Sequence, residues 1–255
     1  MKIRLTGTGT SQGVPVIACD CKVCKSKDPK DKRLRTSAII EWDNLKYVID
    51  TGPDFRQQML QADIHSLDGI FYTHEHADHT AGIDDIRPLY FKMKRPIPIY
   101  AHPRVIEDLK KRYEYIFTNV NRYPGAPQVL PFSPKAYRSY FIGGKEIIPL
   151  LVKHGPLDIY GYKIDKMAYI TDAKSLPPKT KELINNLDLL IINSLHRKKH
   201  KMHLNLEESL ALIDELKPKR AILIHISHYM GLHSEINPQL PDNVELGYDG
   251  LEIEV

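Results

Sequence analysis

The sequence has few cysteines, one tryptophan and no long apolar run. Its 255 residues include 3 Cys and 1 Trp. No apolar stretch approaches the length of about 18 residues that a membrane span needs, and residues 1–13 lack the apolar core of a signal peptide. These absences argue against a disulfide-stapled secreted domain. We therefore expect a cytoplasmic protein without membrane contact.

Strong charge of one sign is also lacking. The 36 basic and 32 acidic residues give a net charge of +4 at neutral pH. That excess is too small to indicate a nucleic-acid partner, but it suits a small anionic substrate. No repeat, low-complexity tract or Gly/Ser linker divides the chain. We expect a single domain over residues 1–255, with a long loop or small cap at about 113–144.

Short apolar segments alternate with helical patterns in both halves of the chain. The clearest helical pattern follows Asn205, which stands at an N-cap position with Glu208 three residues on. Two such series favour two sheets packed face to face with helices outside. The predicted strands are 2–6, 36–42, 46–50, 68–72, 146–153, 159–164, 167–170, 187–192, 221–224, 244–246 and 251–255, and the predicted helices are 55–62, 103–115 and 206–216.

All three cysteines lie in one short segment, as Cys19, Cys21 and Cys24. Thiols stay reduced in the cytosol, so a cysteine cluster there indicates a metal site before it indicates a disulfide. Thiols this close in sequence would also form disulfides of poor geometry. A tetrahedral metal site needs four ligands, so a fourth ligand from elsewhere in the chain is expected.

The strongest chemical signal is the segment Thr73-His-Glu-His-Ala-Asp-His79. In an extended segment His74 and His76 point the same way, and a turn then brings Asp78 and His79 to a second centre. Imidazole and carboxylate suit zinc, manganese or iron. Two such ions about 3.5–4 Å apart stabilise both the attacking and the leaving oxygen of a hydrolysis. The motif therefore predicts a dinuclear hydrolytic centre.

Three further residues of ligand type each end an apolar strand pattern. They are His154, Asp172 and His225. Sheet-based active sites place their functional groups at such strand ends. Each residue alone could equally be a hydrogen-bonded strand end, but together with the histidine-rich loop they favour metal ligands.

In this order, the seven residues resemble the ligand set of the metallo-β-lactamase-fold hydrolases. Asp50, in Val48-Ile-Asp-Thr-Gly52, matches that family's early Asp-x-Gly segment. The resemblance implies an α/β (α+β) fold, a four-layer αβ/βα sandwich of two mixed β-sheets flanked by helices. It further implies one ion on His74, His76 and His154, another on Asp78, His79 and His225, and Asp172 as a bridge.

Both ends of the chain resemble the PhnP-like cyclic phosphodiesterase group. That resemblance implies a separate structural zinc on the three cysteines, with His228 as the fourth ligand. It also implies a catalytic pair of zinc or manganese ions, and a substrate such as 5-phosphoribosyl 1,2-cyclic phosphate. The segments responsible are Leu5–Gly9, Ser11–Pro15, Cys19–Cys24, His225–His228 and Gly247–Ile253.

The expected reaction is hydrolysis of a small cyclic or diester phosphate by a metal-bridging hydroxide. Asp78 and His203 are the expected catalytic residues. His203 matches the histidine that the PhnP resemblance implicates as general acid, while His196 and His200 compete for that role in the same basic stretch. Asp50 and Asp249 are expected to orient ligand imidazoles.

Three other functions stay open from the sequence. A tRNA 3′-processing endonuclease of the same fold would need an RNA-gripping arm, and 113–144 is short and not strongly basic. A non-catalytic metal-binding module would usually lack ligands. A thioester or lactam hydrolase could use the same metal core, since a fold does not select a substrate. We expect no nucleic-acid partner, and the oligomeric state, monomer or homodimer, is undecided.

Overall fold

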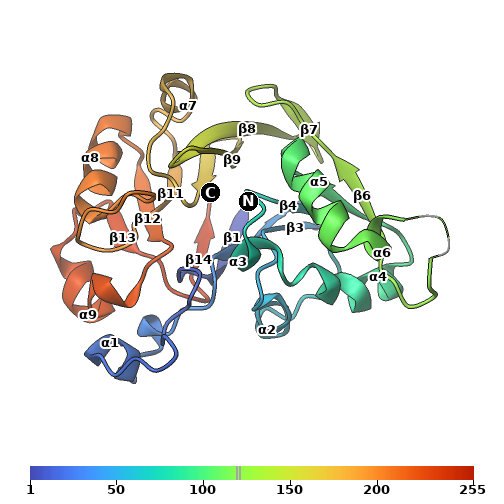
Figure 1. The fold of residues 1–255 in the computed structure, drawn as a ribbon. Helices are drawn as coiled ribbons and strands as arrows, with labels where there is room; N and C mark the ends of the chain where they lie inside the picture. Colours follow the sequence, from blue (N-terminus) through green and yellow to red (C-terminus); the bar gives the residue numbers. More distant parts are fainter. Residues whose placement is uncertain (119, 121) are drawn as a thin grey trace.

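In the computed structural model, which describes residues 1–118, 120 and 122–255, the described chain forms two seven-stranded sheets (Figure 1). The first sheet is antiparallel where the chain termini lie and parallel toward β6. Its strands, in spatial order, are β14 (Glu252–Glu254), β1 (Lys2–Gly7), β2 (Ser37–Trp42), β3 (Leu45–Ile49), β4 (Gly69–Phe71), β5 (Ile97–Tyr100) and β6 (Val129–Phe132).

The second sheet repeats this plan. It is antiparallel from β7 to β10 and parallel from β10 to β13. Its strands, in spatial order, are β13 (Val244–Leu246), β12 (Arg220–Ile224), β11 (Leu189–Asn193), β10 (Met167–Ile170), β9 (Leu157–Ile164), β8 (Lys145–His154) and β7 (Tyr140–Ile142). Each sheet therefore has an antiparallel half and a parallel half.

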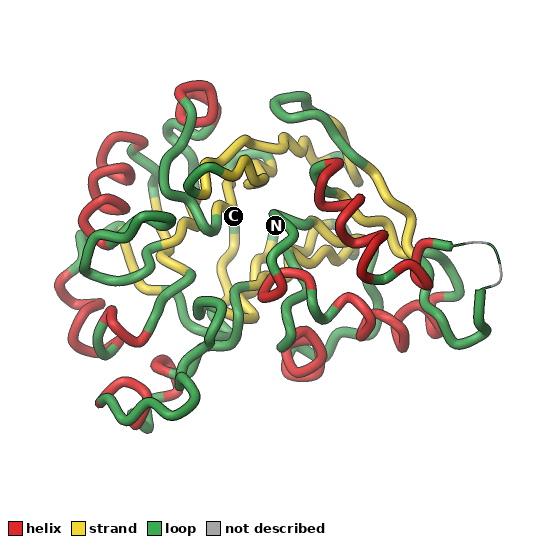
Figure 2. The backbone as a smooth tube through the Cα atoms, viewed as in Figure 1, coloured by secondary structure: helices red, strands yellow, loops and turns green. Residues whose placement is uncertain are grey.

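Helices cover the outer face of each sheet, so the molecule has four layers (Figure 2). The first sheet packs against α2 (Phe55–Gln61), α4 (Arg87–Met93), α5 (Pro103–Arg112) and α6 (Glu114–Phe117). The second sheet packs against α7 (Pro178–Leu183), α8 (Leu206–Leu216) and α9 (His233–Ile236). This arrangement confirms the sandwich expected from the sequence.

The inner layer is an apolar core between the two sheets. It contains strand residues from both halves of the chain, including Ile3, Ile40, Ile191 and Ile222. The single tryptophan, Trp42, lies in this core and stacks on Tyr47 with ring centroids 4.5 Å apart. Because the core ties sequence-distant strands together, the strand ends at the edge of the sandwich are held in fixed positions.

Several predicted elements are confirmed and several were missed. The predicted capping box at α8 is present, since Asn205 Oδ1 accepts from Glu208 N–H and Glu208 Oε2 accepts from Asn205 N–H. The stretch expected as a long loop or small cap, at about 113–144, contains α6, β6 and β7, and β6 pairs with β5. Asn119 and Asn121 of that loop lie outside the described residues. Of the elements described above, the prediction also missed β5, β7, α4, α7 and α9.

Three strand ends near the edge of the sandwich have a left-handed backbone. Asp50, Asp172 and His225 follow β3, β10 and β12 with φ of 62°, 57° and 55°. A non-glycine residue in this conformation is uncommon, although aspartate and histidine adopt it more often than most residues do. All three are among the predicted site residues. Separately, no described helix has the length and apolar character to cross a membrane.

Candidate metal centre

The histidine-rich loop leaves the end of β4 and turns into the short helix α3 (Ala77–Thr80). Thr73, His74 and His79 are buried, whereas His76 is exposed. Gly52 packs closely against this turn, since a Cβ at position 52 would lie 2.2 Å from the carbonyl oxygen of Asp78. This close approach explains the glycine of the Asp-x-Gly segment.

One buried carboxylate orients two of the ligand imidazoles. Asp50 Oδ2 accepts from Nδ1 of His79 at 2.7 Å and from the hydroxyl of Thr73 at 2.7 Å. Because the Thr73 hydroxyl donates to Asp50, it accepts from Nδ1 of His74 at 3.0 Å. Both rings therefore keep Nε2 for the centre, as in carboxylate–histidine–metal arrangements. Asp50 therefore has the contacts that its expected orienting role requires.

Two more imidazoles are oriented by neutral acceptors. The carbonyl oxygen of Met202 accepts from Nδ1 of His154 at 3.1 Å. The hydroxyl of Thr36 donates to the carbonyl of Gly9 and accepts from Nδ1 of His225 at 3.1 Å. Nε2 of each ring is again left for the centre.

Asp249 lies elsewhere, and the expectation that it orients a ligand imidazole is wrong. Its carboxylate accepts from the backbone N–H and hydroxyl of Thr8 at 2.8 and 2.7 Å, and from the N–H of Leu34 at 2.6 Å. The carbonyl oxygen of Thr8 in turn accepts from Ile226 N–H at 2.8 Å. Asp249 therefore supports the segment after His225 through the backbone and not through a ring.

The first group of candidate ligand atoms comes from His74, His76 and His154. These atoms all lie within 4.8 Å of one another. His74 Nε2 is 3.0 Å from Nδ1 of His76. Neighbouring ligands of a tetrahedral ion with bonds of about 2.0–2.1 Å lie about 3.3 Å apart. The donor set therefore fits a small divalent ion with a fourth position open.

The second group gathers around the carboxylate of Asp172. Its Oδ2 lies 3.3 Å from Nε2 of His79, and its Oδ1 lies 3.3 Å from Nε2 of His225. Asp78 Oδ2 is 3.2 Å from the same nitrogen of His79. That nitrogen is buried and has no hydrogen-bond partner among the described residues. The ligand atoms of His74, His79 and Asp172 all lie within 4.8 Å of one another and could hold a divalent ion. Asp78 and His225 each lie beside one member of that group.

The carboxylates and imidazoles set each other's charge. Burial alone would lower the pKa of His79, but the carboxylates of Asp172, Asp78 and Asp50 raise it well above its usual value. Burial opposes the charge of Asp172, yet His225 and His79 hold its pKa well below the usual range. The centre thus keeps ionised carboxylates in a buried place, where a divalent cation would be stabilised.

His203 stands beside this centre. Its Nδ1 lies 3.6 Å from Asp172 Oδ1, and its ring stacks between those of His225 and His200, each with a centroid distance of 5.1 Å. Burial, with His225 nearby, lowers the pKa of His203 to about 3. His196 is further out, with its ring 5.9 Å from that of His200. Of the three predicted candidates for the general acid, His203 is the one whose ring nitrogen lies beside a carboxylate of the centre.

Two arginines of α5, which no sequence motif singles out, contact the histidine-rich loop. Arg104 holds both carboxylate oxygens of Glu75, at 2.8 and 3.2 Å, and also donates to the carbonyl of Asp158 at 2.8 Å. Arg112 donates to the carbonyl of Glu75 at 2.9 Å and to the hydroxyl of Thr80 at 3.0 Å. The one sequence signal for such an arginine is Glu75 itself, an acidic residue between the candidate ligands His74 and His76.

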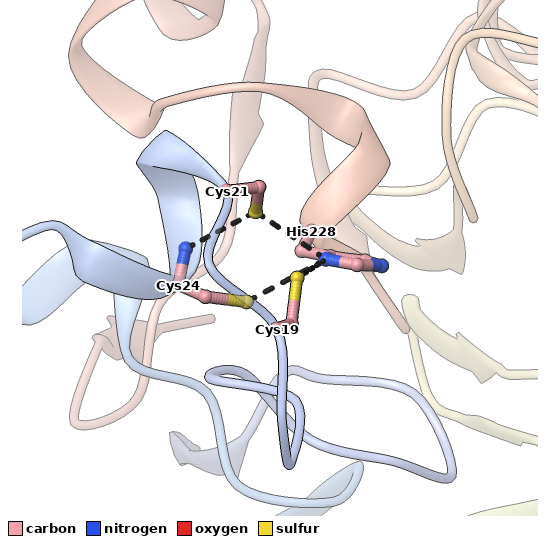
Figure 3. Close-up of side chains that lie close together, drawn as sticks. All are labelled: Cys19, Cys21, Cys24 and His228. Carbon is pink, nitrogen blue, oxygen red and sulfur yellow. Dashed lines mark hydrogen bonds between the residues drawn. The ribbon is translucent and has the colours of Figure 1, made fainter.

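The three cysteines meet His228 in a separate cluster (Figure 3). Nδ1 of His228 lies 3.2, 3.4 and 3.5 Å from the Sγ atoms of Cys19, Cys21 and Cys24. The backbone N–H of Cys24 lowers the pKa of Cys21 to about 6, whereas burial raises the pKa of Cys24 to about 11. Sulfur and nitrogen ligands of one zinc lie about 3.5 Å apart, so the cluster fits that ion.

Comparison with known proteins agrees with this geometry. A family model described as "Beta-lactamase superfamily domain" matches residues 46–226. The structure of Zn²⁺-bound PqqB from Methylobacterium extorquens is similar in fold, with a TM-score of 0.82, 16% identity and full coverage of both chains. The chain belongs to the metallo-β-lactamase superfamily.

Within that superfamily the chain is a member of the PhnP family. A crystal structure described as a new diphosphatase from the PhnP family is 39% identical, with a TM-score of 0.92, and covers 99% of this chain and 96% of that one. An octanoyltransferase of Porphyromonas gingivalis is 41% identical over 254 residues, which are 99% of this chain and 51% of that protein. The chain thus spans about half the length of this curated relative.

Proposed function

We propose that the chain, acting as one domain over residues 1–255, is a metal-dependent hydrolase of a small cyclic or diester phosphate. The observation that supports the proposal is the pair of ligand-atom groups that share His74, with His203 beside Asp172 of the second group. The groups are His74, His76 and His154, and His74, His79 and Asp172. Two zinc or manganese ions fit these groups, and a structural zinc fits the cysteine cluster. When bound, the paired ions would activate water and neutralise charge on the phosphoryl group.

The residues around the candidate ligands orient the imidazole rings and supply a proton to the leaving group. Asp50, Thr36 and the Met202 carbonyl hold the imidazoles in place through their Nδ1 atoms. His203 is the proposed proton donor to the leaving oxygen. An anionic phosphoryl group beside His203 would favour its protonated ring, since an opposite charge stabilises the cation. His196 and His200 lie further along the same row of rings and are poorer candidates.

A diphosphate is a second candidate substrate. It is favoured by the relative described as a PhnP-family diphosphatase, which matches this chain over almost its whole length. The bond cleaved would then be P–O–P, and the same paired ions would neutralise its charge. Hydrolysis rates for a cyclic phosphate, an open diester and a diphosphate, measured side by side, separate these substrates.

The other functions have weaker support. An acyl transfer through a thiol needs a free cysteine, whereas all three thiols of this chain lie against His228. The name of the octanoyltransferase applies to a protein about twice as long. A tRNA-processing role needs an arm, whereas described residues of 113–144 supply α6, β6 and β7, of which β6 and β7 are sheet edges.

The proposal is tested with bis-p-nitrophenyl phosphate and protein loaded with Zn²⁺ or Mn²⁺. We expect metal-dependent release of nitrophenol by the wild type and a loss of at least about a hundredfold in kcat for Asp78→Ala. Far-UV circular dichroism checks that the variant stays folded. Wild-type kcat in Asp78→Ala would contradict the assigned role of this carboxylate.

A further inference from the structure

A row of five rings leads from the metal centre to the surface. The centroid distances are 5.1 Å from His225 to His203, 5.1 Å to His200, 5.9 Å to His196 and 6.2 Å to Tyr229. His225 is buried, whereas the Tyr229 side chain is 72% exposed. The proposed chemistry uses only the two inner rings, so the outer part of the row has no assigned role.

Tyr229 is held in place even though its ring is exposed. Its ring lies 4.0 Å from that of His228, the candidate fourth ligand of the cysteine cluster. Its backbone N–H donates to the hydroxyl of Ser227, and the N–H of Ser227 donates to the carbonyl of Leu195 at 2.9 Å. A large ring fixed at its base and open to solvent offers a flat face that a planar ligand could cover.

The segment that carries the middle of the row is strongly basic. It runs from Leu195 to Leu204, whose backbone groups pair at 3.0 Å and close it as a loop. Arg197, Lys198, Lys199 and Lys201 are exposed, and in the described part of the chain none of them has an ion-pair partner. Glu208, at the start of the next helix, is held by Lys174. This unpaired positive charge favours a polyanionic ligand.

His196 adds a polar group beside the tyrosine. Its Nδ1 is buried and has no hydrogen-bond partner within the described residues. Buried polar atoms in native proteins are normally satisfied, so an unsatisfied one next to a ligand-binding surface indicates a group that a ligand could pair with. A sugar hydroxyl or a base nitrogen has the required donor or acceptor character.

We propose that Tyr229, His196 and the loop 195–204 form an outer subsite for the nucleoside end of the substrate. The base stacks on Tyr229, His196 pairs with a polar atom of the nucleoside, and the loop cations hold a phosphate. The reacting phosphoryl group then lies at the inner end of the row. This inference rests on the proposed function and names its substrate class, a nucleotide-containing phosphodiester or diphosphate.

The test is calorimetric binding of AMP and ribose 5-phosphate to the full-length, metal-loaded protein. The two ligands differ mainly in the base. We expect AMP to bind about tenfold more tightly, the size of one base–aromatic stack. Tyr229→Phe should keep this ratio, whereas Tyr229→Leu, which has apolar bulk without a ring, should bring it close to one. Binding of ribose 5-phosphate should not change in either variant.

The loop cations provide a matched control. Lys198→Gln combined with Lys199→Gln should weaken both ligands severalfold at low salt and leave their ratio intact. Zinc content is measured in every variant, so that any loss of zinc from the cluster around His228 is recognised. Binding is compared only between samples that hold their full zinc content. Equal binding of AMP and ribose 5-phosphate by the wild type, or a retained ratio in Tyr229→Leu, overturns the subsite.

Failure of the subsite and failure of the proposed function give different results. Calorimetry needs no turnover, so an AMP preference without any diester or diphosphate hydrolysis would refute the hydrolase and leave the subsite standing. Hydrolysis of bis-p-nitrophenyl phosphate without an AMP preference would refute the subsite alone.

Discussion

Asp50 and His79 share a hydrogen bond of 2.7 Å between Oδ2 and Nδ1 in the interior of the protein. Their side chains are 0% and 1% exposed. The same carboxylate also accepts from the backbone N–H of Thr73 at 2.8 Å and from its hydroxyl at 2.7 Å. Asp50 therefore fixes the beginning and the end of the histidine-rich loop at once.

The first prediction concerns this carboxylate. Asp50→Asn keeps the volume but places an amide against donors, so one hydrogen bond is lost and His79 loses its orienting charge. We expect metal affinity at the dinuclear centre to fall by about 10–100-fold. Competition with a chromogenic chelator measures the affinity. Asp63→Asn, at a side chain that is 88% exposed, is the matched control and should bind like the wild type. Wild-type affinity in Asp50→Asn would contradict the orienting role.

The second prediction concerns Arg104, which contacts the histidine-rich loop from α5. Arg104→Lys keeps the positive charge but loses the two-pronged hydrogen bond to Glu75 and the bond to the Asp158 carbonyl. Because Arg104 is 35% exposed, the cost in unfolding free energy should be only about 1 kcal/mol.

The diagnostic readout for Arg104 is metal affinity, which should fall severalfold while far-UV circular dichroism stays unchanged. Arg56→Lys, at an exposed position on α2, is the control. If both variants hold metal equally well, Arg104 is a surface ion pair and not a positioning residue.

The third prediction concerns Gly52, which packs against the histidine-rich loop. A methyl group in Gly52→Ala would meet the carbonyl of Asp78 at 2.2 Å, so the loop must move and metal binding should be lost or strongly weakened. Gly144→Ala is the comparison, since its φ is +77° but no atom lies within 4 Å of the added Cβ. That variant should cost only about 1 kcal/mol of backbone strain and bind metal normally. Equal metal content in the two variants would argue against the close approach.

The fourth prediction separates the two metal sites. Cys21→Ser removes one thiol from the cluster around His228, so the protein should lose about one equivalent of zinc and unfold at a lower temperature. The stability lost would be about 2.7 kcal/mol if free zinc exceeds Kd a hundredfold. The kcat of the folded, catalytically loaded fraction should change little. Loss of activity with unchanged zinc content and Tm would show that the cluster takes part in catalysis.

The parts of the fold that could be predicted from sequence carry local signals. The helix at Leu206–Leu216 has both a side-chain cap and helical spacing, and it forms as expected. The strand Ile97–Tyr100 follows a basic stretch and contains a proline, so its pairing between β4 and β6 was missed. The strand Val129–Phe132 is short and at an edge, where tertiary pairing outweighs a loop-like composition.

In the candidate site, too, some features have a local sequence signal and others do not. Residues of ligand type at the ends of apolar strands were identifiable, because such strands otherwise end in turn residues. The left-handed backbone of Asp172 and His225 could not be predicted, because aspartate and histidine tolerate this conformation but adopt it only in a minority of cases. The place of Asp249 was predicted wrongly, because its partners Thr8 and Leu34 are distant in sequence and offer backbone groups.

The most direct test of the central claim is a metal titration of stripped protein with diester hydrolysis as the readout. One equivalent of Zn²⁺ should fill the cysteine cluster without full activity, and two further equivalents of Zn²⁺ or Mn²⁺ should bring hydrolysis of bis-p-nitrophenyl phosphate to its maximum. The account is contradicted if the stripped protein is fully active, or if the metal-saturated protein cleaves no phosphodiester and no diphosphate.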